Sequence, residues 1–430
     1  MTRMRILFGA VAMLLLLPAQ AQLTLDECQR LARDNYPLLK QYDLIEQATD
    51  YSVANIKRGY LPQLSVSGQA SYQSDVATLP DVLTGLLTSN GYQYKGMARD
   101  QYRIAVDLNQ VIWDGGNLKA RRDMAGKDGL VQTAQTDVDL YAVRQRVNEL
   151  FFGLLLLEEK IRLNEDLQTL LQDNCRKLEA RLGHGTAMKA DVDMMKAEWL
   201  KARRDRTALQ SQREAYSRML ALFIHKDVAE IRDLQKPDAS WPVSFESRRP
   251  ELALYAARLS QTEARQKLLQ AGLRPRLSLF AQGYYGYPGY DMFADMFGHD
   301  WSLNGRIGVR LTWDISKLYT YKDDRRKLDL TRMQTETAQA TFLFNNRLQS
   351  TREQAAVEQY RKMMAYDEDI IAMRTSVRQA AEKKLEHGVI DANGLLQEIT
   401  RENQARTECS THEIEMLKSL FELKHTLNQE

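Results

Sequence analysis

Hydrophobic and polar residues alternate in four short segments of the chain. In residues 61–73 (LPQLSVSGQASYQ), the apolar and small side chains lie on one face of an extended chain, and serine and glutamine lie on the other. A period of two is typical of a β-strand whose two faces meet different surroundings. In the third of these segments Phe280 is the exception to the alternation. The pattern predicts strands at about 62–73, 102–111, 275–287 and 305–314.

The segments between the strands have a helical pattern instead. Apolar residues recur at alternating steps of three and four over 140–161, and the spacing continues over 192–223, which is the a/d seam of a coiled coil. Residues 81–236 and 289–430 contain no proline, so nothing there forbids long helices. A helix over about 117–182 would be roughly 100 Å long, which predicts an elongated protomer.

The sequence also repeats itself. Pro62 matches Pro275 at an offset of 213 residues, and Gly185 matches Gly388 at an offset of 203. The difference must lie in the loop after the first strand, because surface loops tolerate insertions. We therefore predict a signal peptide at 1–21, a first structural repeat at 22–238 (a helix, a β-hairpin at about 62–111, long helices at about 115–225) and a second repeat at 239–430 (a helix, a β-hairpin at about 275–314, long helices at about 317–426).

The N-terminus predicts secretion. Arg3 and Arg5 precede an apolar stretch over 6–17 and a small-x-small cleavage site at 19–21. Without Arg3 and Arg5 the 59 basic residues become 57, equal to the 57 acidic ones. A neutral mature chain disfavours a nucleic-acid partner, which would require a basic surplus.

The strands have two possible interpretations. They could form a water-soluble antiparallel sheet with one face packed on the helices, or a transmembrane barrel with apolar residues toward lipid and polar residues toward a water-filled lumen. Strand lengths near those of membrane strands, aromatic residues near the strand ends and the secretion signal favour the barrel. Four strands cannot close in hydrocarbon, so copies must join: a dimer would give eight strands and a trimer twelve.

Several segments resemble the TolC family of outer-membrane efflux channels. In the first half they are LTLDECQRLARDNYPLLK, YLPQLSVSGQ, LNQVIWDGGNLKARR and LGHGTAMKADVDMMKAEWLKAR, and in the second RRPELALYAARL, LRPRLSLFAQG and LEHGVIDANGLLQEITRENQAR. The resemblance covers essentially the whole mature chain. It implies a mainly α protomer that closes as a homotrimeric α/β barrel, held by outer-membrane lipid and extended into the periplasm. It also implies a passive conduit for drugs, ions or proteins, fed by an inner-membrane pump through a periplasmic adaptor (membrane fusion) protein, in efflux or type I secretion.

The resemblance further implies functional residues where the long helices turn. The family's tip motif, a glycine followed six residues later by Asp-Val, falls on Gly185 and on Asp191 with its neighbour. Gly185 and Thr186 would then meet the adaptor, and Asp191 would start or cap the returning helix and narrow the pore. A plain helix cap explains Asp191 equally well.

The second turn departs from the family pattern. Gly388 and Val389 are the matching adaptor-docking candidates, but position 394 is glycine where the motif has aspartate, so Asp391 is the substitute candidate for the constriction. His184 and His387 flank the two turns. A trimer's six imidazoles could sense pH or bind metal, although common ancestry explains the pair equally well.

The chain is not expected to be an enzyme. It has no His-Glu-x-x-His, nucleophile elbow, phosphate loop or Cys/His cluster, and its three cysteines lack disulfide or metal spacing. No catalytic residue, metal site or cofactor is therefore predicted. The alternative function is a periplasmic coiled-coil adaptor or structural protein without a pore, which would typically have one coiled-coil hairpin and no lipid-facing strands.

Overall fold

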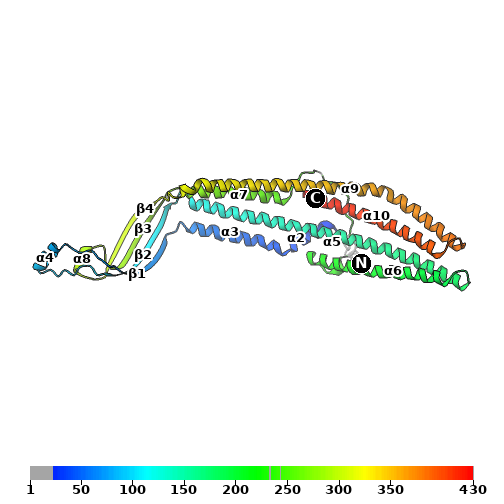
Figure 1. Cartoon of the computed structure of the whole chain (residues 1–430), viewed down its shortest axis with the longest axis horizontal. Helices are drawn as coiled ribbons and strands as arrows, with labels where there is room; N and C mark the ends of the chain where they lie inside the picture. Colours follow the sequence, from blue (N-terminus) through cyan, green and yellow to red (C-terminus); the bar gives the residue numbers. More distant parts are fainter. Residues whose placement is uncertain (1–22, 232–233, 243, 430) are drawn as a thin grey trace, which may run out of the picture. The chain divides into compact units, whose positions relative to one another are not determined.

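The computed structural model describes residues 23–231, 234–242 and 244–429; the predicted signal peptide lies outside them. Long helices and a four-stranded sheet dominate this part of the chain (Figure 1). The elements are α2 (Leu25–Asn35), η1 (Pro37–Lys40), α3 (Gln41–Arg58), β1 (Gln63–Tyr72), α4 (Asp81–Ser89), β2 (Asp100–Trp113), α5 (Asn117–Gly183), α6 (Lys189–Ile224), η2 (Val228–Glu230), α7 (Pro250–Ala271), β3 (Arg276–Tyr287), α8 (Met292–Phe297), β4 (Ser302–Thr312), α9 (Lys317–Glu386) and α10 (Ala392–Leu427).

The two halves of the described chain repeat one order of elements. Helix α3 is followed by β1, α4, β2, α5 and α6, and α7 is followed by β3, α8, β4, α9 and α10. Helices α6 and α10 each have 36 residues. The four predicted strands and the tandem order are confirmed, and the boundary near residue 238 stays a prediction. The loops expected after β1 and β3 each contain a short helix, α4 and α8, which the alternation pattern of the strands did not reveal.

The chain divides into two units, and each takes segments from both halves. The helical unit comprises described residues in 23–41, 135–253 and 338–429, and the sheet unit comprises 42–134 and 254–337. None of the described helices combines the length and the apolar content needed to cross a membrane.

Two apolar clusters stabilise the helical unit. The first joins α2, α5, α6 and α10 around Phe151, Leu154 and Leu220, whose side chains are completely buried. The predicted a/d seam of α5 contributes Val143, Val147, Leu150 and Leu154 to it. Leu140 and Leu157 of the same seam are also buried. The second cluster joins α5 and α6 to α9 and α10 around Met195 and Leu395. Because each large apolar side chain contributes roughly 1.5–3 kcal/mol on burial, these seams hold the two helical hairpins together.

The first cluster generates a prediction about Cys28, which is 0% exposed. Burial, and next the nearby Glu27 carboxylate, raise the pKa of the Cys28 thiol to about 12. Maleimide reacts with an accessible thiolate, so Cys28 of the folded protein should stay unlabelled at about pH 8 and also at about pH 10, still below its pKa. Peptide mass spectrometry measures the labelling, and unfolded protein is the control that labels at all three cysteines. Fast labelling of folded Cys28 would contradict this core.

Candidate functional site

The sheet has a register that largely separates an apolar face from a polar face. Its order is β1-β2-β3-β4, and every neighbouring pair is antiparallel. Opposite residues in such a ladder project to the same face. In one cross-strand row Leu64 pairs with Leu108, Leu108 with Ala281, and Ala281 with Ile307. Apolar residues thus line up with apolar residues across all four strands.

The apolar face of the sheet is not covered by the described residues of this chain. Val66 on β1, Ile104 on β2 and Ile307 on β4 are 70%, 56% and 74% exposed, although each belongs to a regular strand. The interpretation in which the helices cover this face is therefore wrong for the chain on its own. A contiguous exposed apolar surface of this kind is typical of a contact with lipid or with another protein.

The opposite face is mainly polar. The row next to that of Ile307 contains Ser65, Asp107, Gln282 and Arg306 in register. The Gln282 side-chain amide donates a hydrogen bond to Asp107, with 2.5 Å between Nε2 and Oδ1. One face of the sheet is thus suited to hydrocarbon and the other to water.

Phe280, the exception in the alternation, lies on this polar face. Its register partner on β4 is Gly308, where a Cβ atom would come within 3.0 Å of the Phe280 ring. The Arg310 guanidinium lies over the same ring, 4.7 Å from its centroid. A glycine opposite and a cation–π contact above let the ring lie on a polar surface.

The first predicted docking turn, between α5 and α6, is a Schellman motif. The N–H of Gly185 donates to the carbonyl of Leu182 (3.0 Å), and the N–H of Thr186 donates to that of Arg181 (2.9 Å). Gly185 has a φ of 72°, the left-handed conformation that this motif requires at the position after the helix. Gly185 and Thr186 are both exposed.

The second turn, between α9 and α10, has the same geometry. The N–H of Gly388 donates to the carbonyl of Leu385 (3.0 Å), and the N–H of Val389 donates to that of Lys384 (2.8 Å). Gly388 also has a φ of 72°. Val389 is 68% exposed, so an apolar side chain is presented at this turn.

Arg181 joins the two turns. Its guanidinium donates to the carbonyl of Leu385 in the second hairpin and to the carbonyl of Thr186 in its own. The four docking candidates are therefore brought to one end of the helical unit. His184 and His387 are exposed there. Among the described residues, no group of three or more His, Cys, Asp or Glu side chains is arranged to hold a metal ion.

The two candidate constriction carboxylates both start returning helices, but in different ways. Asp191 lies in the first turn of α6, and its Oδ2 accepts the N–H of Met188 at 3.1 Å. Asp391 is the N-cap of α10, and its Oδ1 accepts the N–H of Gly394 at 2.9 Å. The capping interpretation thus has a physical basis at both positions. A role in a pore stays a prediction.

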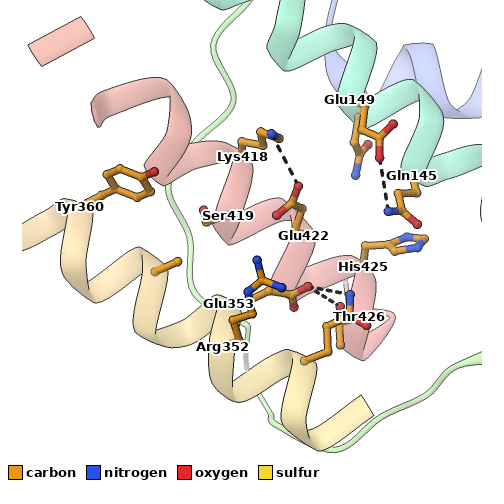
Figure 2. A pocket seen from close by; sticks show the side chains of 13 residues that line it. Gln145, Glu149, Arg352, Glu353, Tyr360, Lys418, Ser419, Glu422, His425 and Thr426 are labelled. Carbon is orange, nitrogen blue, oxygen red and sulfur yellow. Dashed lines mark hydrogen bonds and ion pairs between the residues drawn. The ribbon is translucent and has the colours of Figure 1, made fainter. Parts of the chain in front are cut away.

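The helical unit also contains a polar pocket that no sequence motif predicted. It has a volume of about 350 Å³ and lies between α5, α9 and α10 (Figure 2). Glu353 is 7% exposed and accepts hydrogen bonds from Thr426 and Gln349, both at 2.9 Å. Its second oxygen has no hydrogen-bond partner among the described residues. The lining residues come from three distant segments, and only their polarity at buried helix positions could have suggested the pocket.

Burial shifts the pKa values of titratable side chains that line this pocket. Burial raises the pKa of Glu353 and, independently, that of Glu422. Burial, followed by the positive charges of Arg249 and Arg144, lowers the pKa of His425 to about 3, so the imidazole is neutral at physiological pH. His425 stacks on Tyr141 with 4.4 Å between the ring centroids. The pocket is therefore a largely buried polar contact between α5, α9 and α10.

Comparison with known proteins assigns the fold. Residues 29–223 match the outer membrane efflux protein family. This chain carries an outer membrane efflux protein domain. The predicted family resemblance is confirmed, and the family is one of outer-membrane proteins. No curated protein matches the chain.

Solved structures extend the likeness of this efflux-protein domain to nearly the whole chain. The outer-membrane channel OprN has a TM-score of 0.71 at 13% identity, over 94% of this chain and 90% of that one. VceC of Vibrio cholerae has a TM-score of 0.69 at 12% identity (94% and 96% covered), and MtrE of Neisseria gonorrhoeae 0.67 at 15% (94% and 89%). The predicted class, mainly α with long helices and four barrel-type strands, is confirmed.

The geometry of the first turn predicts opposite stability effects for alanine substitutions at two glycines, two residues apart. Gly183 ends α5 and Gly185 has a φ of 72°, and neither would meet another atom within 4 Å on gaining a Cβ. Gly185→Ala should lower the free energy of unfolding by about 1 kcal/mol through backbone strain. Gly183→Ala should raise it by about 0.5 kcal/mol because glycine disfavours helix. Thermal unfolding followed by circular dichroism compares them, and equal effects would contradict the assigned turn.

Proposed function

We propose that this chain is the outer-membrane exit duct of a tripartite efflux or type I secretion system. The observation that carries the proposal is the sheet in which one face is apolar and uncovered and the other is polar. A lipid bilayer outside and water inside are the surroundings that match such a sheet. The duct is passive, so drugs, ions or proteins move through it after a pump has delivered them.

The edges of the sheet support assembly from several copies. Strands β1 and β4 each have a partner on one side only among the described residues. Unpaired backbone N–H and C=O groups cost several kcal/mol each in hydrocarbon, so a lipid-embedded sheet must close. Pairing β1 of one copy with β4 of the next closes it. Three copies give twelve strands and leave an open lumen, which favours a homotrimer over an eight-stranded dimer.

The helices offer a second surface for the same assembly. Along α9, Tyr366, Ile370, Met373 and Val377 follow steps of four, three and four residues, and they are 68%, 45%, 68% and 46% exposed. This is a coiled-coil seam without a cover from the described part of its own chain. Packing against neighbouring copies would bury it and would continue the duct as an α-helical barrel in the periplasm.

The turns are the proposed contact with a periplasmic adaptor, which links the duct to an inner-membrane pump. Gly185, Thr186, Gly388 and Val389 are exposed at one end of the helical unit. Asp191 and Asp391 are the proposed constriction at the same end. A periplasmic adaptor without a pore is disfavoured because it has no use for the uncovered apolar sheet. The family that residues 29–223 match is one of efflux proteins.

Two neighbouring residues of β1 test the membrane assignment. Val66 lies on the apolar face and Ser67 on the polar face, and both are exposed. Val66→Arg should destabilise the inserted protein by about 2–4 kcal/mol, because it places a cation in lipid, while Ser67→Arg points into water and should be tolerated. Outer-membrane fractionation and a heat-labile oligomer on electrophoresis are the measurements. Release of the unaltered protein by osmotic shock as a soluble monomer would contradict the proposal.

Neutralising the two aspartates tests the constriction. Asp191→Asn combined with Asp391→Asn preserves side-chain oxygens that can cap the helices but removes the charges. If the carboxylates form a narrow ring, block of the reconstituted channel by Mg²⁺ should weaken about tenfold, because carboxylate oxygens are its ligands. Asp193→Asn, at an exposed position in the same helix, is the matched control. Unchanged block in the double variant would exclude this constriction.

A further inference from the structure

The polar face of the sheet is strongly cationic. The register places four arginines on it, and the acidic residue on it is Asp107. Four arginines against one aspartate leave an excess of three positive charges per chain. The arginines are Arg103 on β2, Arg276 on β3, and Arg306 and Arg310 on β4.

These guanidinium groups are available to solutes. All four arginines are exposed, and none forms an ion pair with another described residue. Asp107 accepts its hydrogen bond from Gln282 rather than from an arginine. The Arg310 and Arg306 guanidinium groups lie 4.7 and 6.0 Å from the Phe280 ring centroid, which orients them without neutralising them. The charge of this face is therefore not compensated within the sheet.

The arginines are spread along the strands. In register, Arg103 lies at the level of Ser302, Arg276 lies opposite Thr312, and the two arginines of β4 lie between these levels. Ten residues of antiparallel strand span roughly 34 Å, so the positive charge extends over most of the strand section. A solute crossing this section would meet guanidinium groups at four successive levels.

Pore dimensions decide whether such charges act on a passing ion. Twelve strands spaced about 4.8 Å apart and tilted by about 40° give a backbone radius of roughly 12 Å. Side chains reduce the open radius further. The Debye length is about 8 Å at physiological ionic strength, so ions anywhere in the lumen remain within reach of the wall charges.

We propose that the strand section of the duct prefers anions, and that it suits exported solutes with carboxylate or phosphate groups. The inference rests on the proposed function, because the polar face becomes a lumen only when copies close the barrel. Guanidinium groups bind both kinds of oxyanion, and rings of arginine or lysine favour anions in pores. Uncompensated arginines in a narrow aqueous passage thus raise the local concentration of anions and lower that of cations.

Acidic groups outside the polar face stay the same in every variant of the test. In the loop between β3 and β4, Asp295 is buried and accepts the N–H of Gly289 at 2.6 Å, and Asp291 caps α8. Asp300 is exposed in the same loop. The constriction candidates Asp191 and Asp391 belong to the helical unit. These carboxylates are unchanged in variants of the strand arginines, so a difference between variants reports on the strands.

Reversal potentials test the inference. The full chain is reconstituted in planar lipid bilayers with a KCl gradient, and the chloride-to-potassium permeability ratio is measured. Arg306→Gln with Arg310→Gln should lower this ratio by about twofold or more. Arg306→Lys with Arg310→Lys retains the charge and should leave the ratio unchanged. Arg30→Gln, which removes one exposed charge from α2, is the second control and should also have no effect.

The outcomes separate the two proposals. A wild-type chain that conducts, with a ratio that is the same in the glutamine variant, would overturn the anion preference and leave the duct intact. A loss of preference in the lysine variant as well would assign the effect to side-chain packing around Phe280 and would likewise overturn it. A wild-type chain that forms no channel would overturn the duct and the preference together.

Discussion

The need to pair backbone hydrogen bonds at the two edges of the sheet governs the architecture of this protein. Strands β1 and β4 end the sheet within one chain, and a bilayer offers no water to satisfy their outer N–H and C=O groups. A protomer with an uncovered apolar face and two open edges is incomplete in lipid. Closure with further copies satisfies the edges and encloses the polar face in one step.

The helical unit meets a different requirement. Its two apolar clusters bury Phe151, Leu154 and Met195 within the chain. The α9 seam that begins at Tyr366 is exposed in the described part of the chain. The two turns are fixed by paired backbone hydrogen bonds and by Arg181, which joins one hairpin to the other. The proposed docking end is thus held by backbone hydrogen bonds, and its exposed side chains are not needed to fix the turns.

Much of this fold could be predicted from the sequence, because period-two and a/d patterns record which face of each element is apolar. The strands and the long helices lie close to their predicted bounds for that reason. Helix α4 was missed because none of its residues is buried, and α8 because its six residues are too few to show a helical period. The Glu353 pocket was missed because its residues converge from distant segments. Asp191 and Asp391 could be placed at helix starts, while a role in a pore depends on contacts between copies.

The bulge in β2 has a consequence for how this protein can change in evolution. The register of β2 against β3 shifts between Val111 and Trp113, and Trp113 returns to a position opposite Leu277 at the end of the ladder. A single-residue insertion within a strand would exchange the two faces beyond it, turning arginines toward lipid. Lineages of this protein should therefore gain or lose strand residues in pairs or at the bulge, and vary freely in length only in the loops.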